Sequence, residues 1–75
     1  MSILFSLSVL QKLEQLPDML VEQRELLGLT QRQLAERLGM KEQQIQRYES
    51  SRYQAASLRR LIEVAQALAS DAPEA

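Results

Sequence analysis

Residues 30–50 read TQRQLAERLGMKEQQIQRYES, and most of the expected architecture follows from them. Thr30 is a good helix N-cap, and the glutamine three residues after it can complete a capping box. The helix that these residues predict, at about residues 31–38, ends at Gly39, which readily takes the positive φ of a tight turn. A second short helix is predicted at about residues 42–49. The stretch therefore predicts two short helices that are joined by a sharp corner.

The apolar residues of this stretch are spaced so that they can close the corner between the two helices. Ala35 is small at a point where two helices must cross closely, and Met40 lies in the turn itself. The full set consists of Leu34, Ala35, Leu38, Met40, Ile45 and Tyr48. Because the outer face of the second helix is polar, this set indicates a helix-turn-helix, a motif that places one helix in the major groove of DNA.

The rest of the chain also reads as helix. Its 75 residues suffice for one domain with a small core, and no run of β-branched and aromatic residues predicts a strand. Leu16-Pro17 should break the first helix, because the residue before a proline is pushed out of the helical region. Further helices are expected at about 17–27, with Gly28 beyond its C-terminus, and at about 58–69. We therefore expect an all-α protein.

The expected organisation has three parts. Residues 1–16 form an N-terminal amphipathic helix, residues 17–69 form the helix-turn-helix domain, and residues 70–75 form a disordered polar tail. The core contacts expected from the second and the last helix are Leu20, Val21, Leu27, Leu58, Leu61, Ile62, Ala65 and Leu68.

The N-terminal helix carries two apolar stripes on different faces. The first stripe consists of Phe5, Val9, Leu13 and Leu16, and the second stripe consists of Ile3, Leu7 and Leu10. One stripe can lie on the rest of the domain, whereas the other would be exposed in a monomer this small. We expect the second stripe to form a homodimer. The alternatives are that both stripes wrap into one core or that the segment frays.

The residue types that are missing exclude several functions. The chain has no cysteine and no histidine, which excludes disulfides, thiolate or imidazole metal sites, and catalysis by these side chains. We expect no cofactor and no metal, and an enzyme is not expected because a small helical bundle has little room for a pocket. No stretch approaches the roughly 20 apolar residues of a membrane span. A cytoplasmic protein is expected.

Charge is unevenly distributed along the chain. The formal net charge is −1. Residues 30–60 carry seven basic and three acidic residues, whereas the rest of the chain carries two basic and seven acidic residues. The positive part coincides with the helix-turn-helix, as binding to phosphates requires, although a solvated mixture of charges would give a similar count.

The stretch LGLTQRQLAERLGMKEQQIQRYE resembles the Xre/Cro-type helix-turn-helix domains of lambdoid phage repressors and bacterial regulators. The resemblance runs from about Leu20 to Leu68. It implies a compact five-helix, lambda-repressor-like domain whose third helix reads bases, to which this chain adds an N-terminal helix. It also implies a partly buried ion pair between Arg24 and Glu49.

The resemblance places the base contacts on Glu42, Gln43, Gln44 and Arg47. Glutamine can bond adenine at N6 and N7, arginine can bond guanine at O6 and N7, and Glu42 could accept from cytosine N4. The alternative is that this polar face only keeps the helix soluble. The expected phosphate contacts are Gln31, Lys41, Arg52 and Arg32, with Arg59 a weaker candidate.

Three positions depart from the family pattern. Lys41 stands where an N-cap serine or threonine is frequent, Ser51 stands where glycine is frequent, and the loop YQAAS lacks the usual proline. These departures affect details of the loops and leave the expected fold unchanged.

The sequence thus predicts a sequence-specific transcriptional regulator, most simply a repressor. Its partners would be double-stranded DNA and a second copy of the chain, on a two-fold operator with half-sites about 10 to 10.5 bp apart or a multiple of this. The alternative is an antitoxin-type or adaptor protein whose N-terminal helix binds a protein partner such as a toxin.

Overall fold

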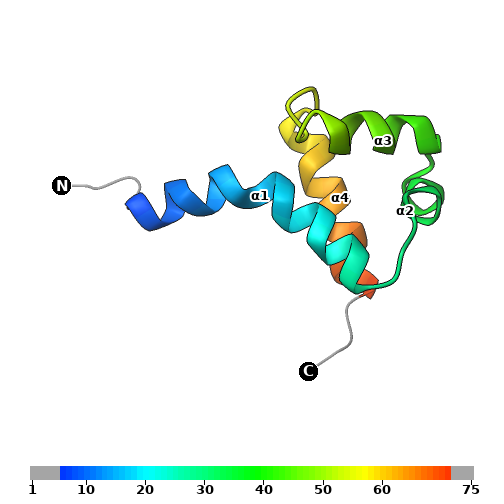
Figure 1. Cartoon of the computed structure of the whole chain (residues 1–75), viewed down its shortest axis with the longest axis horizontal. Helices are drawn as coiled ribbons and strands as arrows, with labels where there is room; N and C mark the ends of the chain where they lie inside the picture. Colours follow the sequence, from blue (N-terminus) through cyan, green and yellow to red (C-terminus); the bar gives the residue numbers. More distant parts are fainter. Residues whose placement is uncertain (1–5, 72–75) are drawn as a thin grey trace.

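The computed structural model describes residues 6–71, and for Asp71 it describes the backbone alone. These residues form four helices and no strand, so the protein is all-α (Figure 1). The helices are α1 (Leu7–Leu26), α2 (Gln31–Leu38), α3 (Glu42–Ser50) and α4 (Leu58–Asp71). The prediction of a five-helix domain with an added N-terminal helix is wrong in its count.

The difference lies at Pro17, where the expected break does not occur. Pro17 lies inside α1, which continues for 20 residues from Leu7 to Leu26. A proline in a helix removes one backbone hydrogen bond and crowds the carbonyl four residues earlier, and bending the helix relieves this crowding. Figure 1 shows that the two halves of α1 run in different directions. The chain therefore accommodates the proline by a bend and needs no second helix start.

Local contacts fix both ends of α2 and the start of α3. The Thr30 hydroxyl accepts from the Gln33 amide at 3.0 Å, and the Gln33 side chain accepts from the Thr30 amide at 2.8 Å. Gly39 has φ 67°, a left-handed conformation that a side chain would disfavour. Lys41 makes no side-chain cap, but its amide donates to Oε1 of Gln44 at 3.0 Å. Gln44 thus supplies one of the two hydrogen bonds of a capping box, and the lysine side chain does not supply the other.

One core lies between α2, α3, α4 and the C-terminal half of α1. Its buried residues are Leu20, Leu29, Leu34, Ala35, Ile45, Tyr53, Val64 and Leu68. On α4 the buried face differs from the expected one, since Val64 is fully buried while Leu58 and Ile62 are 71% and 49% exposed. Leu61 and Ala65 pack partly against the core.

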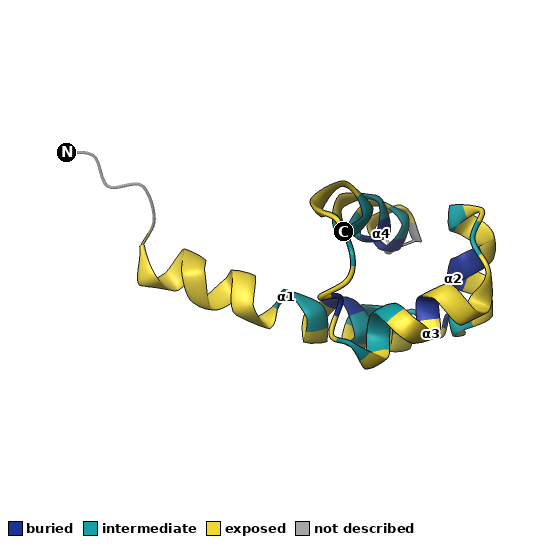
Figure 2. Cartoon of the chain, turned by 90° about the horizontal axis from the view of Figure 1, so that it is seen from above, coloured by how far each residue is buried: buried dark blue, intermediate teal, exposed yellow. Residues whose placement is uncertain are grey.

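The N-terminal half of α1 projects away from this core (Figures 1 and 2). We call residues 7–16 the α1 arm. It begins after Ser6, whose hydroxyl caps the helix by accepting from the Val9 amide, so the helix starts later than in the expected range of residues 1–16. Both apolar stripes are exposed on the arm: Leu7 is 77% and Leu13 is 52% exposed. Of the described residues of the first stripe, Leu16 packs partly against the core while Val9 and Leu13 are exposed, so this stripe does not lie on the domain along its whole length.

Some expectations lie outside the described residues, namely those on Ile3 and Phe5 and on residues 72–75 of the tail. Ser70 and Asp71, which were expected in the tail, belong to α4. No helix within residues 6–71 is long and apolar enough to cross a membrane.

Candidate nucleic-acid interface

The helices α2 and α3 form the helix-turn-helix (Figure 1). After the left-handed Gly39, the Met40 amide donates to the Ala35 carbonyl at 2.8 Å and closes the corner. Ala35 and Ile45 are buried between the helices, at 1% and 0% exposure. Because an alanine lies at the joint, the two helices can approach closely, and α3 is held at a fixed angle on α2.

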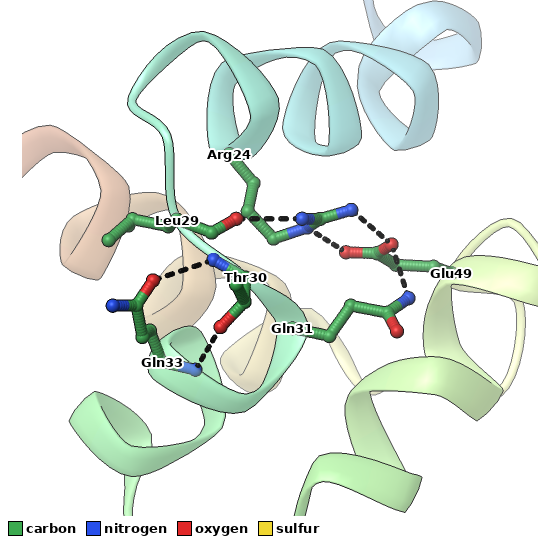
Figure 3. A network of polar contacts seen from close by, with 6 residues as sticks. All are labelled: Arg24, Leu29, Thr30, Gln31, Gln33 and Glu49. Atoms are coloured by element: carbon green, nitrogen blue, oxygen red, sulfur yellow. Dashed lines mark hydrogen bonds and ion pairs between the residues drawn. The ribbon is translucent and has the colours of Figure 1, made fainter.

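A polar network fixes α3 to the two preceding helices (Figure 3). Nε and Nη2 of Arg24 donate to the two carboxylate oxygens of Glu49 at 2.7 and 3.0 Å. Nη1 of Arg24 donates to the Leu29 carbonyl at 2.8 Å. Nε2 of Gln31 donates to Oε1 of Glu49 at 2.9 Å. Glu49 thus joins α3 to α1 through Arg24 and to α2 through Gln31.

The side chains of Arg24 and Glu49 are only 11% and 9% exposed, so the ion pair is largely removed from water. Such a pair gains its Coulomb energy in a medium of low dielectric constant, and the bidentate geometry satisfies both carboxylate oxygens. Loss of either partner would leave a charge buried without its counterpart. The network therefore makes the orientation of α3 depend on α1, which lies outside the helix-turn-helix itself.

The outer face of α3 is polar and exposed. It presents Glu42, Gln43, Gln44, Gln46 and Arg47. Within residues 6–71, the side chains of Gln43 and Arg47 make no hydrogen bond or ion pair, and both are therefore available to a ligand. Oε1 of Gln44 already accepts from the Lys41 amide, and Gln46 donates weakly to Glu42 at 3.5 Å.

These contacts rank the four expected base-contacting residues by availability. Gln43 and Arg47 present all their donors and acceptors. Gln44 retains its amide nitrogen and one lone pair of its oxygen, so bidentate contact with adenine would have to share that oxygen with the helix cap. Glu42 is exposed but is held near Gln46.

The four expected phosphate contacts differ in the same way. Lys41 is exposed and its ammonium has no partner among residues 6–71. Arg32 lies 3.7 Å from Glu36, and both side chains are largely exposed, so this pair is weak. Arg52 donates to Asp18 of α1. The Gln31 side chain is engaged with Glu49, which leaves its backbone amide at the start of α2 as the group that can face an anion.

The loop after α3 contains a buried aromatic residue that the sequence reasoning missed. Arg52 and Tyr53 have φ of 56° and 59°, an unusual conformation for residues other than glycine. Tyr53 is 3% exposed, its amide donates to the Tyr48 carbonyl at 2.6 Å, and its ring stacks on Tyr48 with centroids 5.6 Å apart. Burial, with a smaller contribution from the nearby Glu49 carboxylate, raises the pKa of Tyr53 to about 12. The stacked pair holds the loop against the end of α3.

A shallow acidic cleft borders the helix-turn-helix on its α1 side. Asp18, Glu22 and Glu25 of α1 line it opposite Gln31 and Gln46. Asp18 is paired with Arg52, so the negative charge of this cleft comes mainly from Glu22 and Glu25, which would disfavour a phosphate backbone beside them. Within the described residues, no group of three or more Asp or Glu side chains is arranged to hold a metal ion.

Comparison with known proteins gives one finding. The protein-family model described as Helix-turn-helix matches residues 20–74, which covers the last two turns of α1 and all of α2, α3 and α4. No curated protein and no solved structure matches the chain. The α1 arm, residues 7–16, lies outside the matched region.

Proposed function

Since the chain belongs to the Xre/Cro-type helix-turn-helix family of DNA-binding proteins, we propose that it is a sequence-specific transcriptional regulator that reads DNA through α3. The observation that carries the proposal is the contrast within α3. Its inner residues Ile45 and Glu49 are fixed by packing and by the polar network, while its outer residues remain exposed and polar. A helix that is held rigidly and presents glutamine and arginine fits base recognition in the major groove.

Gln43 and Arg47 are the principal base-reading residues in this proposal. Arg47 would contact guanine at O6 and N7, and Gln43 would contact adenine at N6 and N7. Gln44 and Glu42 have secondary roles, because their side chains also take part in contacts within α3 and its cap. Lys41, Arg52, Arg32 and the backbone amide of Gln31 would bind phosphates and fix the register without adding sequence preference.

The regulator acts as a dimer on a two-fold operator and, in the simplest case, represses transcription by blocking polymerase. Dimer formation would place two α3 helices in successive major grooves on one side of the duplex, so half-sites about 10 to 10.5 bp apart are expected. Two weakly binding half-sites then act together, which a domain of this size needs in order to bind tightly.

The test is selection of bound sequences from a random duplex pool at two salt concentrations. The wild type is compared with Arg47→Ala and Gln43→Ala, and Gln66→Ala on α4 is the control for removal of an exposed glutamine. We expect an inverted repeat for the wild type and the control, with preference at one base pair relaxed in each α3 variant. If no motif is recovered and the remaining binding disappears with salt, base reading by α3 is wrong.

Protein binding is a second candidate function, and the exposed apolar residues of the α1 arm favour it. In that case the chain would be an antitoxin-type or adaptor protein, with DNA binding retained or lost. Capture of a different protein by the arm, with no self-association, would support this alternative.

A further inference from the structure

The α1 arm carries an apolar ridge whose outer part, Val9 and Leu13, is exposed, while Leu16 at its base packs partly against the core. Val9, Leu13 and Leu16 of the first stripe lie on one side of the arm at spacings of four and three. Val9 and Leu13 are 39% and 52% exposed. A helical segment as short as the arm is only marginally stable in water without packing, so we expect a partner to cover the ridge.

An apolar groove lies at the base of the arm, between α1 and α4. Its walls are Leu16, Met19 and Leu20 from α1 and Ala65, Leu68 and Ala69 from α4. Gln23 is its one polar residue, and its volume is about 370 Å³. The small side chains Ala65 and Ala69 leave the wall on the α4 side low enough to receive another helix.

The ridge and the groove match in length but cannot meet within one chain. From Val9 to Leu16 the ridge rises about 10 Å, and from Leu16 to Gln23 the groove extends about 10 Å. Both belong to the same continuous helix α1, so the arm cannot fold back into its own groove without breaking that helix. The occupant of the groove has to come from another molecule.

We propose that two copies of the chain exchange arms, so that Val9 and Leu13 of each copy lie in the α1–α4 groove of the other. Leu16 belongs both to the ridge and to the groove. In a two-fold symmetric dimer, the ridge of each copy contacts the groove of the other. The interface is therefore centred near Leu16, and the two α1 helices run antiparallel. The inference deepens the dimer part of the proposed function and identifies the surface involved, which is the face opposite to Leu7.

Helix polarity favours the antiparallel arrangement. The C-terminal half of α1 and α4 run in the same direction in Figure 1, and the two helices are in contact. An antiparallel arm from the second copy would bring its positive N-terminal end toward the negative C-terminal end of α4. The first turn of α1 carries no acidic residue and the last turn of α4 carries no basic residue, so neither end is already compensated by its own helix.

The first experiment is sedimentation equilibrium of the full chain without DNA, for the wild type, Leu13→Glu and Leu7→Glu. Both positions are exposed on the arm, and Leu7 lies nine residues from Leu16, about two and a half turns and thus on the opposite face. We expect a wild-type dimer whose dissociation constant rises roughly a hundredfold in Leu13→Glu, because two carboxylates would enter apolar grooves. Leu7→Glu should leave the dissociation constant within a factor of about three, as for a change outside an interface.

The second experiment uses the absence of natural cysteine. With Leu16→Cys as the single cysteine, air oxidation should give a covalent dimer as the main product, because the two copies of this residue meet at the two-fold axis. Leu7→Cys should give only traces of covalent dimer under the same conditions. Circular dichroism of each variant shows whether the helices are retained.

Three results would overturn the proposal. A wild type that stays monomeric at all concentrations excludes arm exchange, and dissociation by Leu7→Glu but not by Leu13→Glu assigns the interface to the second stripe. A dimer that neither variant affects would point to another surface, such as the exposed Leu58 and Ile62 of α4. Since DNA is absent, each of these results leaves base reading by α3 to be decided by its own selection experiment.

Discussion

The α1 arm and the helix-turn-helix differ in what stabilises their short helical segments. The helices α2 and α3 have only eight and nine residues, yet they are fixed by a capping box, a left-handed glycine and the network around Glu49. The arm has a good N-cap at Ser6, but within the described chain only Leu16 at its base packs against the core. Local hydrogen bonds can therefore determine where a helix begins, but a short helix is stable in water only when one of its faces is buried against another part of the protein or against a partner.

The two regions also differ in what their exposed faces offer. The outer face of α3 is polar and is well solvated by water, so it can remain exposed when no ligand is bound. The exposed face of the arm is apolar, and its exposure is unfavourable until a partner covers it. The contrast predicts that substitutions in the fixed region change global stability, whereas substitutions on the arm change association and local helix content.

The largest effect is expected from Glu49→Ala. The change leaves Arg24 largely buried without its counterion and removes the acceptor of Gln31, so the free energy of unfolding should fall by about 3 to 5 kcal/mol. Urea unfolding measures the loss. The matched control is Glu25→Ala, an exposed carboxylate of α1, which should change stability by less than about 0.5 kcal/mol. Equal effects of the two variants would show that the network contributes little.

The next effect depends on pH and concerns Tyr53. Its pKa is raised to about 12 in the folded protein, above the ordinary value of 10, because it is buried. Its neutral form therefore contributes stability that is complete below pH 10 and is lost as the pH rises from 10 to 12, roughly 2 to 3 kcal/mol in total. Unfolding measured across this range should show the loss in the wild type and a smaller loss in Tyr53→Phe. Identical pH profiles would mean that Tyr53 ionises as it does in the unfolded chain.

A third prediction compares the two faces of α4. Val64→Ala should lower the free energy of unfolding by about 2 kcal/mol, because it removes two buried methyl groups and leaves a cavity. Ile62→Ala removes more atoms but from a half-exposed side chain, and should cost less than about 1 kcal/mol. Chemical denaturation of both variants gives the comparison. A larger loss of stability in Ile62→Ala than in Val64→Ala would indicate that α4 buries the face expected from the sequence, which contains Leu58 and Ile62.

The α4 helix shows why the core could be predicted only in part. The sequence offers two overlapping apolar faces, one with Leu58 and Ile62 and one with Val64, and both share Leu61 and Leu68. Helical spacing cannot choose between them, since the choice depends on where α1 and α2 lie. The buried Ile45 could be predicted because the corner at Gly39 fixes its surroundings within a few residues.

The candidate nucleic-acid interface could also be predicted only in part from the sequence. Its motif is local, so the caps and the exposed face of α3 follow from residues 30–50. Arg24 and Glu49 lie 25 residues apart, and their proximity was expected from the family resemblance rather than from spacing. The pairing of Arg52 with Asp18 spans 34 residues and depends on how the loop after α3 meets α1, for which the sequence carries no signal.

The smallest effect on global stability, and the most local one, is expected at the boundary between the two regions. Pro17→Ala restores the missing amide of α1 and removes the cause of its bend. Because Leu16 is the residue of the arm that packs against the core and the rest of the described arm is exposed, the urea midpoint should move little. Amide hydrogen exchange in residues 7–16 should instead slow by roughly tenfold or more, since a continuous hydrogen-bond ladder would connect the arm to the core. A large rise in the urea midpoint without added protection in the arm would show that Pro17 strains the core rather than separating it from the arm.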